Sequence, residues 1–221
     1  MTRTDATALL KSEAKRLGFI EARVARAEFL SDEAPRLEEW LKHGMHGSMR
    51  YMENHFDKRL DPRKLVPGAK SVVSLAFNYY PAASELEGDD RPRVARYAYG
   101  EDYHRVVKDR LFELLDVLRT AVGDLDGRCF VDSAPVMERA WAERSGLGWV
   151  GKNSLILRKN TGSYFFLAEL ILDYEFVADL PVADHCGTCT RCIDACPTQA
   201  IVAPKVVDSA RCISHATIEL H

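Results

Sequence analysis

Four cysteines near the end of the chain form one short run. Cys186, Cys189, Cys192 and Cys196 follow the spacing C-x2-C-x2-C-x3-C, and Pro197 comes next. Thiolates bind iron–sulfur clusters or zinc, and this spacing with its final proline is typical of iron–sulfur clusters. A zinc ribbon would instead separate two cysteine pairs by a longer spacer. The run predicts an iron–sulfur site, with zinc as the alternative, and a short helix that begins at the proline.

The order of these ligands predicts two clusters. In this motif the fourth cysteine ligates the other cluster of a two-cluster module. We therefore expect one cluster on the first three cysteines of the run, and a second on Cys196 and Cys212. Three ligands would still be missing, so either the sequence is truncated or the clusters are incomplete.

A carboxylate, Asp132, is a second candidate for a chemical role. Residues 128–132 (RCFVD) predict a strand that ends at Asp132, and Pro135 predicts the start of a helix over residues 136–145. A carboxylate between a strand end and a helix N-terminus is a common active-site position. It is equally a good helix cap, so the residues alone leave both interpretations open.

Three further stretches could contact a ligand. Residues 58–63 (KRLDPR) form a basic turn, which is either a solvated surface loop or an anion-binding turn. Residues 146–154 are rich in glycine but lack the spacing of a P-loop; glycines here would allow close backbone approach. Residues 44–52 contain several methionines and a tyrosine, which we interpret as packing rather than as a ligand site.

Apolar spacing predicts an α/β fold that would position these residues. The β-branched, apolar run over residues 71–79 predicts a central strand. Helical spacing and caps predict helices over 4–17 (capped by Thr4 or Asp5), 31–43, 103–122 (capped by Asp102) and 136–145. Further strands are expected over 19–24, 128–132, 154–157 and 164–172, the last two as a hairpin across 159–162. Residues 81–92 predict an acidic surface loop and 179–182 a linker.

The composition is that of a globular chain of 221 residues, with 47% hydrophobic and 29% charged residues. It has no apolar run of about 18 residues that would cross a membrane, and its N-terminus lacks a secretory signal. The net charge of −3 argues by itself against a nucleic-acid module, although local basic patches could still exist. Clustered cysteines fit thiols used for metal in a reducing cytosol, so we expect a cytoplasmic protein without a membrane partner.

Several stretches, taken in order over nearly the whole chain, resemble the epoxyqueuosine reductase family. Each is weak apart from the cysteine run, but their joint order is specific. They are residues 51–62 (YMxxHxxKRxDP), 100–104 (GxDYH), 131–139 (VDSxPxxER), 148–153 (GWxGKN), 196–201 (CPTxAI) and 211–214 (RCIS).

The resemblance implies a cobalamin-binding catalytic domain over residues 1–180, with a central mixed sheet flanked by helices. A ferredoxin-like 4Fe–4S domain would follow over residues 181–221. The implied reaction is the reduction of epoxyqueuosine to queuosine at the wobble position of tRNA. Two 4Fe–4S clusters would supply electrons that make cob(I)alamin. The implied partners are tRNA bearing epoxyqueuosine and an electron donor such as a ferredoxin or flavodoxin, and we expect a monomer.

The resemblance also assigns site residues. Asp132 matches the family's proposed proton donor, because an epoxide oxygen leaves easily only when it is protonated. For that role its carboxyl must hold a proton near neutral pH, which burial against the corrin would favour. The positions that match the family's cobalamin site are Arg59, Asp132, Asn153, Ile156, Leu167 and Ser214.

The chain departs from the family at its end. Relatives continue into a second cysteine motif and a helical-repeat tail, so we expect a C-terminally truncated chain whose remaining cluster ligands lie further on. Two alternatives stay open. One is an iron–sulfur electron-transfer protein, which stoichiometric cobalamin binding would count against. The other is a cobalamin-dependent reductase of the reductive-dehalogenase type, against which residues 131–139 favour the queuosine enzyme.

Overall fold

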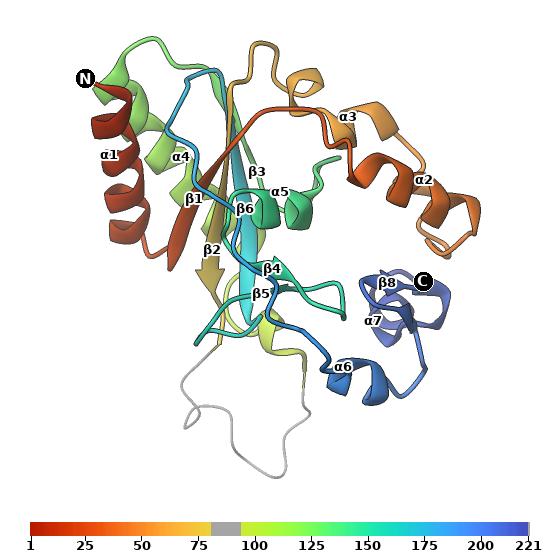
Figure 1. The fold of residues 1–221 in the computed structure, drawn as a ribbon. Coiled ribbons are helices and arrows are strands. Elements are labelled where there is room, and N and C mark those ends of the chain that lie inside the picture. Colours follow the sequence, from red (N-terminus) through yellow and green to blue (C-terminus); the bar gives the residue numbers. More distant parts are fainter. Residues whose placement is uncertain (81–93, 221) are drawn as a thin grey trace.

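A four-stranded antiparallel sheet forms the centre of the molecule (Figure 1). The structure, a computed structural model, describes residues 1–80 and 94–220. The spatial order of the strands is β1 (Glu21–Arg26), β2 (Ser71–Asn78), β6 (Phe165–Leu172) and β3 (Gly127–Phe130). The two inner strands, β2 and β6, pair along their whole lengths. Both are almost entirely buried, because helices cover both faces of the sheet.

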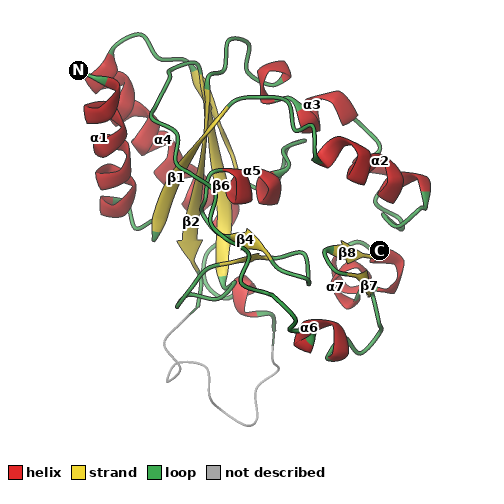
Figure 2. Ribbon diagram, viewed as in Figure 1, coloured by secondary structure: helices red, strands yellow, loops and turns green. Residues whose placement is uncertain are grey.

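The helices divide between the two faces of this sheet (Figure 2). Helices α1 (Arg3–Arg16) and α4 (Tyr103–Val122) pack against one face and against each other, around a core of leucine, valine and alanine side chains. Helix α5 (Glu138–Arg144) packs against β2 and β6 from the other face. Helices α2 (Glu33–Lys42) and α3 (Phe56–Leu60) extend from this second side, where Leu37, Leu60 and Trp141 share a core.

The predicted fold class is confirmed, with two corrections to the sheet. The sheet is antiparallel rather than mixed, since each pairing among its four strands runs antiparallel. The predicted hairpin is wrong: β5 (Ile156–Leu157) pairs with β4 (Trp149–Val150), while β6 enters the main sheet. The eight residues of β6 bury more apolar surface between β2 and β3 than a two-residue partner could cover.

Local capping explains where the helices begin. Helix α1 starts one residue after Thr2, which forms a capping box with Asp5, so the predicted cap at Thr4 or Asp5 was wrong. Helix α4 begins after Asp102, as predicted, and the Asp102 carboxylate accepts the His104 amide proton. Helix α5 begins three residues after Pro135 rather than at it, because the intervening chain forms tight turns.

The C-terminal part is small and packs beside α2. It contains α6 (Arg191–Asp194), β7 (Ile201–Ala203), β8 (Val206–Val207) and α7 (Ile213–Ile218). The short helix predicted after Cys196 lies before it instead, as α6. The chain contains 3-10 turns at Arg50–Met52, Pro62–Lys64, Arg96–Ala98 and Ser209–Arg211. Residues 179–182 contain neither helix nor strand, and the acidic loop predicted over 81–92 lies outside the described residues. None of the described helices has the length and apolar character to cross a bilayer.

Candidate active site

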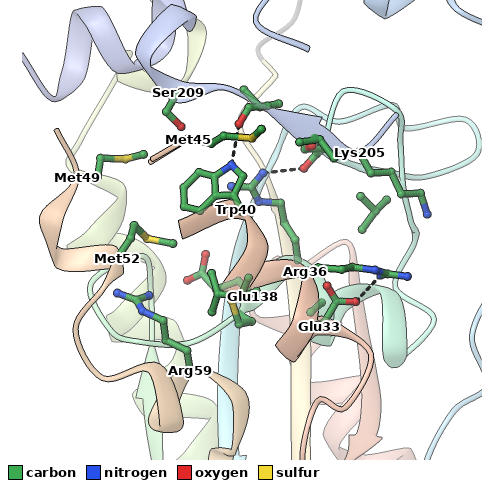
Figure 3. Close-up of a pocket in the computed structure, with 18 of the residues that line it drawn as sticks. Glu33, Arg36, Trp40, Met45, Met49, Met52, Arg59, Glu138, Lys205 and Ser209 are labelled. Carbon is green, nitrogen blue, oxygen red and sulfur yellow. Dashed lines mark hydrogen bonds and ion pairs between the residues drawn. The ribbon is translucent and has the colours of Figure 1, made fainter. Parts of the chain in front are cut away.

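A cavity of about 1430 Å³ lies between α2 and α5, on one side of the sheet, and the C-terminal part (Figure 3). Its wall combines α2, the following 43–55 segment, the turn before α5, the β4–β5 loop and residues 204–219. Pockets for ordinary small ligands span about 300–1,000 Å³. The volume therefore suits a large cofactor together with part of a substrate.

Arg59 is a buried cation in this wall, with 8% of its surface exposed. Its Nη2 donates to the Tyr51 carbonyl at 2.7 Å and its Nε to the Asn54 carbonyl at 3.2 Å. Burial lowers the pKa of the guanidinium below its usual range. Within the described part of the chain, no carboxylate forms an ion pair with it. Of the three cations in the basic turn, Arg59 is buried and lines the cavity, while Lys58 and Arg63 are exposed.

Asp132 lies at the same wall, two residues after the end of β3. Its backbone is left-handed, with φ of 54°, and 58% of its side chain is exposed. The Tyr103 hydroxyl donates to its Oδ2 at 2.5 Å, and His104 Nε2 lies 3.7 Å from the same oxygen. The expected burial of this carboxyl is therefore not supplied by the chain itself. It depends on what occupies the cavity.

Tyr103 and His104 form an aromatic support for this carboxyl. The Tyr103 ring stacks on Phe166 of β6 at a centroid distance of 3.9 Å and on His104 at 4.0 Å. Burial, followed by the bond to Asp132, raises the pKa of the Tyr103 hydroxyl, so it stays protonated and donates. His104 Nδ1 lies 2.9 Å from Asp102 Oδ1, which orients the ring.

Two further carboxyls lie behind Asp132. Glu138, the first residue of α5, projects into the cavity (Figure 3), and its Oε1 accepts the Asp132 amide proton at 2.8 Å. Burial raises the pKa of Glu138 to about 7. Glu169 of β6 is fully buried opposite Ser74, and neither of its oxygens has a partner among the described residues. Burial raises the pKa of Glu169 well above its usual range, since a charged carboxylate is disfavoured away from water.

The residues assigned from sequence divide into two groups. Arg59, Asp132, Asn153 and Ser214 line the one cavity, although they come from four separate stretches. Ile156 is 3% exposed and packs among apolar side chains, with Leu167 partly buried against the same cluster. The structure thus places these last two side chains behind the wall rather than on it.

Several wall residues were not identified from sequence. Met45, Met49 and Met52 line the cavity, although they were interpreted as packing (Figure 3). Glu138 was only part of a motif. Glu169 is buried in the sheet and does not line the cavity, but it carried a usable signal, because it is the lone charged residue in an otherwise apolar strand.

The five cysteines between residues 186 and 212 lie in the C-terminal part, each exposed or partly exposed. Cys192 is inside α6, and Cys212 immediately precedes α7. The Cys196 Sγ accepts the Ala200 amide proton at 3.2 Å, and backbone N–H groups at Ile201 and Ala200 lower the pKa of its thiol. In the described ranges no three acidic, histidine or cysteine side chains are close enough to share one ion. The donor set still has the chemistry that iron–sulfur clusters require, since it consists of thiolates on a short exposed segment.

Direct contacts close the cavity on its C-terminal side. Trp40 Nε1 donates to the Val207 carbonyl at 2.8 Å, and the Ser209 amide donates to the Met45 carbonyl at 2.8 Å. The Ser48 amide donates to Nε2 of the buried His215 at 3.2 Å. Gly47 is required beside it: its φ is 60°, and a Cβ would lie 2.9 Å from His215 Nε2.

Family models match both parts of the chain. Residues 59–133 match the family described as epoxyqueuosine reductase QueG, DUF1730. Residues 185–221 match the 4Fe–4S double cluster binding domain. An epoxyqueuosine reductase from Cellulophaga algicola is 58% identical over 212 residues, covering 96% of this chain and 69% of that protein. One from Cyclobacterium marinum is 59% identical over 215 residues, covering 97% and 69%.

Solved structures of the same name share the fold. The epoxyqueuosine reductase from Streptococcus thermophilus superposes with a TM-score of 0.88 at 27% identity, covering 94% of this chain and 56% of that one. An epoxyqueuosine reductase with an epoxyqueuosine-modified tRNA-Tyr stem loop gives 0.83 at 34% identity, covering 94% and 55%. A Bacillus subtilis structure, whose catalytic aspartate loop is described as swung out of the active site, gives 0.82 at 33%, covering 94% and 55%.

More distant structures share the architecture alone. A reductive dehalogenase described as B12-dependent gives a TM-score of 0.53 at 17% identity, covering 93% of this chain and 24% of that one. This chain thus spans about two thirds of its curated relatives and about half of the solved chains. The level of identity, the matched models and the shared fold together show that the chain belongs to the epoxyqueuosine reductase family.

Proposed function

We propose that this chain carries the catalytic part of an enzyme that reduces epoxyqueuosine to queuosine at the wobble position of tRNA. The observation that carries the proposal is the large cavity lined by Asp132, whose carboxyl is bonded by Tyr103 and lies 3.7 Å from His104, in a chain 58% identical to a named epoxyqueuosine reductase. The tRNA partner is supported by the relative whose structure contains the modified stem loop.

Cobalamin fits the cavity. The cofactor is large, mostly apolar on its ring face and fringed with amide groups, and it carries a phosphate. The volume of about 1430 Å³ accommodates it, and the methionine side chains offer an adaptable apolar surface. Arg59, which is buried and forms no ion pair among the described residues, would meet a phosphate or amide oxygen. Asn153 and Ser214 would supply neutral polar contacts.

Asp132 is the residue that we propose to deliver a proton. Reduction of an epoxide to an alkene takes up two electrons and two protons and releases one water molecule. Cobalamin, when bound, would supply the reducing metal centre. Asp132 would protonate the departing oxygen, Tyr103 would hold its carboxyl, and His104 is near enough to return a proton to it. As in the Bacillus subtilis relative, the turn that carries the aspartate would be able to move.

The cysteine segment would supply electrons. We propose that Cys186, Cys189 and Cys192 bind one 4Fe–4S cluster and that Cys196 and Cys212 bind a second. The match to a double cluster binding domain supports this assignment. The domain boundary would fall at residues 180–181, within a stretch that has no helix or strand. We further propose a cytoplasmic monomer that receives electrons from a ferredoxin or flavodoxin.

The experiment is an anaerobic assay of protein loaded with cobalamin and iron, reduced chemically and given tRNA that contains epoxyqueuosine. Nucleoside analysis by mass spectrometry should show conversion to queuosine and no conversion without cobalamin. An EPR spectrum of added cob(II)alamin should change on binding. If iron is present but cobalt does not bind, the electron-transfer alternative replaces the proposal.

A further inference from the structure

The turn between β3 and α5 holds Asp132 in an unfavourable backbone conformation. Asp132 has φ of 54°, a left-handed value that costs a residue with a Cβ about 1 kcal/mol or more. Residues 131–137 form no helix or strand. Their backbone hydrogen bonds to one another close two tight turns: the Ser133 amide donates to the Val131 carbonyl, and the Val136 amide donates to the Ala134 carbonyl. Such a segment keeps one conformation only when groups outside it hold it in place.

Two side chains from different elements hold this turn. Glu138 Oε1 accepts the backbone N–H of Asp132 at 2.8 Å, and the Tyr103 hydroxyl donates to the Asp132 carboxylate. Tyr103 is fixed by its stacking on Phe166 of β6. Glu138 is fixed because α5 packs on β2 and β6. The backbone and the carboxyl of Asp132 are therefore anchored separately, and the backbone anchor is Glu138.

The pKa of Glu138 depends on groups around it, including the Asp132 amide and the Asp132 carboxylate, both of which belong to the turn. The pKa of Glu138 is affected most by burial and next by the bond from the Asp132 amide. The charges of Asp132 on the turn, Arg139 on α5 and His104 on α4 follow, in that order. Tyr103 and Glu169 also face it from α4 and β6, and Arg59 lines the same cavity from α3. Burial is the first cause that raises its pKa to about 7, so the carboxyl changes charge near neutral pH.

We propose that Glu138 is a positioning residue for Asp132, a latch whose carboxyl oxygen holds the Asp132 amide and keeps the 131–137 turn against the cavity wall. The inference rests on the proposed function, in which Asp132 protonates the epoxide oxygen. Because neutral Glu138 still offers a carbonyl oxygen, the latch closes with the acid uncharged. The bond from the Asp132 amide by itself lowers the pKa of Glu138, but burial is the larger effect, so a released turn that admits water to the carboxyl would bring its pKa down towards the ordinary value. The closed state then binds more protons, so closure weakens as pH rises from about 4.5 to about 7.

The test is amide hydrogen exchange by mass spectrometry on the full chain, with rates at each pH divided by those of an unstructured peptide. In the natural protein, protection of residues 131–137 should fall as pH rises from about 5 to about 7 and then level off. Glu138→Gln keeps the acceptor oxygen, so its protection should be independent of pH and equal to the natural value at low pH. Glu138→Ala should exchange roughly tenfold faster or more throughout, because the amide loses its acceptor.

A matched control is Glu143→Ala on the same helix. The Glu143 carboxylate also accepts a backbone amide proton, that of Val150 at 3.0 Å. The Glu143→Ala variant should leave the exchange of residues 131–137 unchanged. Unchanged exchange in Glu138→Ala, or a pH dependence retained in Glu138→Gln, would overturn the proposal. If Glu138→Ala unfolds, the Glu138→Gln pH series decides alone.

Turnover separates this inference from the proposed function. With tRNA and loaded enzyme, Glu138→Ala should lower kcat about tenfold or more with little change in KM, and Glu138→Gln should restore kcat. An unchanged kcat in Glu138→Ala would contradict the positioning role. If the natural protein has no reductase activity, the proposed function fails, while the exchange measurements still test the latch.

Discussion

Glu138 should make the stability of this protein depend on pH in an unusual direction. Its carboxyl has a pKa of about 7 in the folded chain, against an ordinary value of 4.5. The unfolded chain therefore releases this proton first as pH rises, and the folded state is disfavoured progressively from pH 4.5 to pH 7. Each unit by which the folded pKa exceeds the unfolded pKa is worth about 1.4 kcal/mol. The free energy of unfolding should therefore fall by about 3 kcal/mol, and the fall is complete above pH 7.

Glu138→Gln removes this titration while keeping an oxygen that can accept the Asp132 amide proton. The free energy of unfolding of the variant minus that of the natural protein should therefore rise by about 3 kcal/mol between pH 4.5 and pH 7. Groups that do not interact with Glu138 are common to both proteins and cancel in the difference, whereas Glu169 senses the Glu138 charge and leaves a residual contribution. The sign is opposite to that of Asp61, whose pKa is held low by hydrogen bonds from Arg63 and whose contribution is lost as pH falls.

The assay is denaturant unfolding of both proteins at a series of pH values, followed by tryptophan fluorescence, with the slope on denaturant checked for constancy. Glu143→Gln, a partly exposed acid on the same helix, corrects for general effects of removing a carboxyl. If the curves of stability against pH for the natural protein and Glu138→Gln run parallel, the burial argument for Glu138 is refuted.

Three other changes test separate parts of the structure. Asp132→Asn should keep fold and cobalamin binding but reduce turnover by at least about a hundredfold, since proton transfer contributes roughly 10²–10⁴; comparable single-turnover rates would reject its role. Cys189→Ala should lower bound iron, measured by elemental analysis, and leave the circular dichroism of the sheet domain intact; global unfolding would show that the cluster segment supports both parts. Gly47→Ala should lower the free energy of unfolding by about 1–2 kcal/mol from backbone strain, and by more because the new Cβ contacts His215. Gly162→Ala, with φ of 73° and open space around it, should show the strain alone. Equal denaturation midpoints for the two variants would contradict the His215 contact.

Elements with strong local signals were predictable from sequence. Strand β2 has a continuous apolar, β-branched run, and α4 has regular apolar spacing with an aspartate cap, so both were located to within a residue or two. The partner of β6 was not predictable, because strand pairing depends on contacts between distant segments. The start of α5 was misplaced because Pro135 fits a first helical turn but also fits the irregular turn that carries Asp132.

The site was predictable only in part, for similar reasons. Motif order identified Arg59, Asp132, Asn153 and Ser214, which the fold brings to one cavity. The spacing of these four residues along the chain did not indicate that they share one cavity. The burial of Arg59 could not be predicted either, because it depends on packing between distant segments. The net charge of −3 argued against a nucleic-acid partner, yet a sum over the whole surface does not describe one face of it.

The contacts that join residues 40–48 to residues 207–215 also fix when the cavity can form during synthesis. Trp40, Met45 and Ser48 leave the ribosome early, but their partners Val207, Ser209 and His215 are translated about 165 residues later. At roughly 5–20 residues per second, this interval lasts on the order of ten seconds or more. Elements near the N-terminus can form in that time, but the sheet is complete only once β6 has been made, and the wall shared with the C-terminal part comes later still. A large cofactor therefore meets its complete binding surface only after residues 207–215 have been made, which places loading after the synthesis of this segment rather than during that of the sheet.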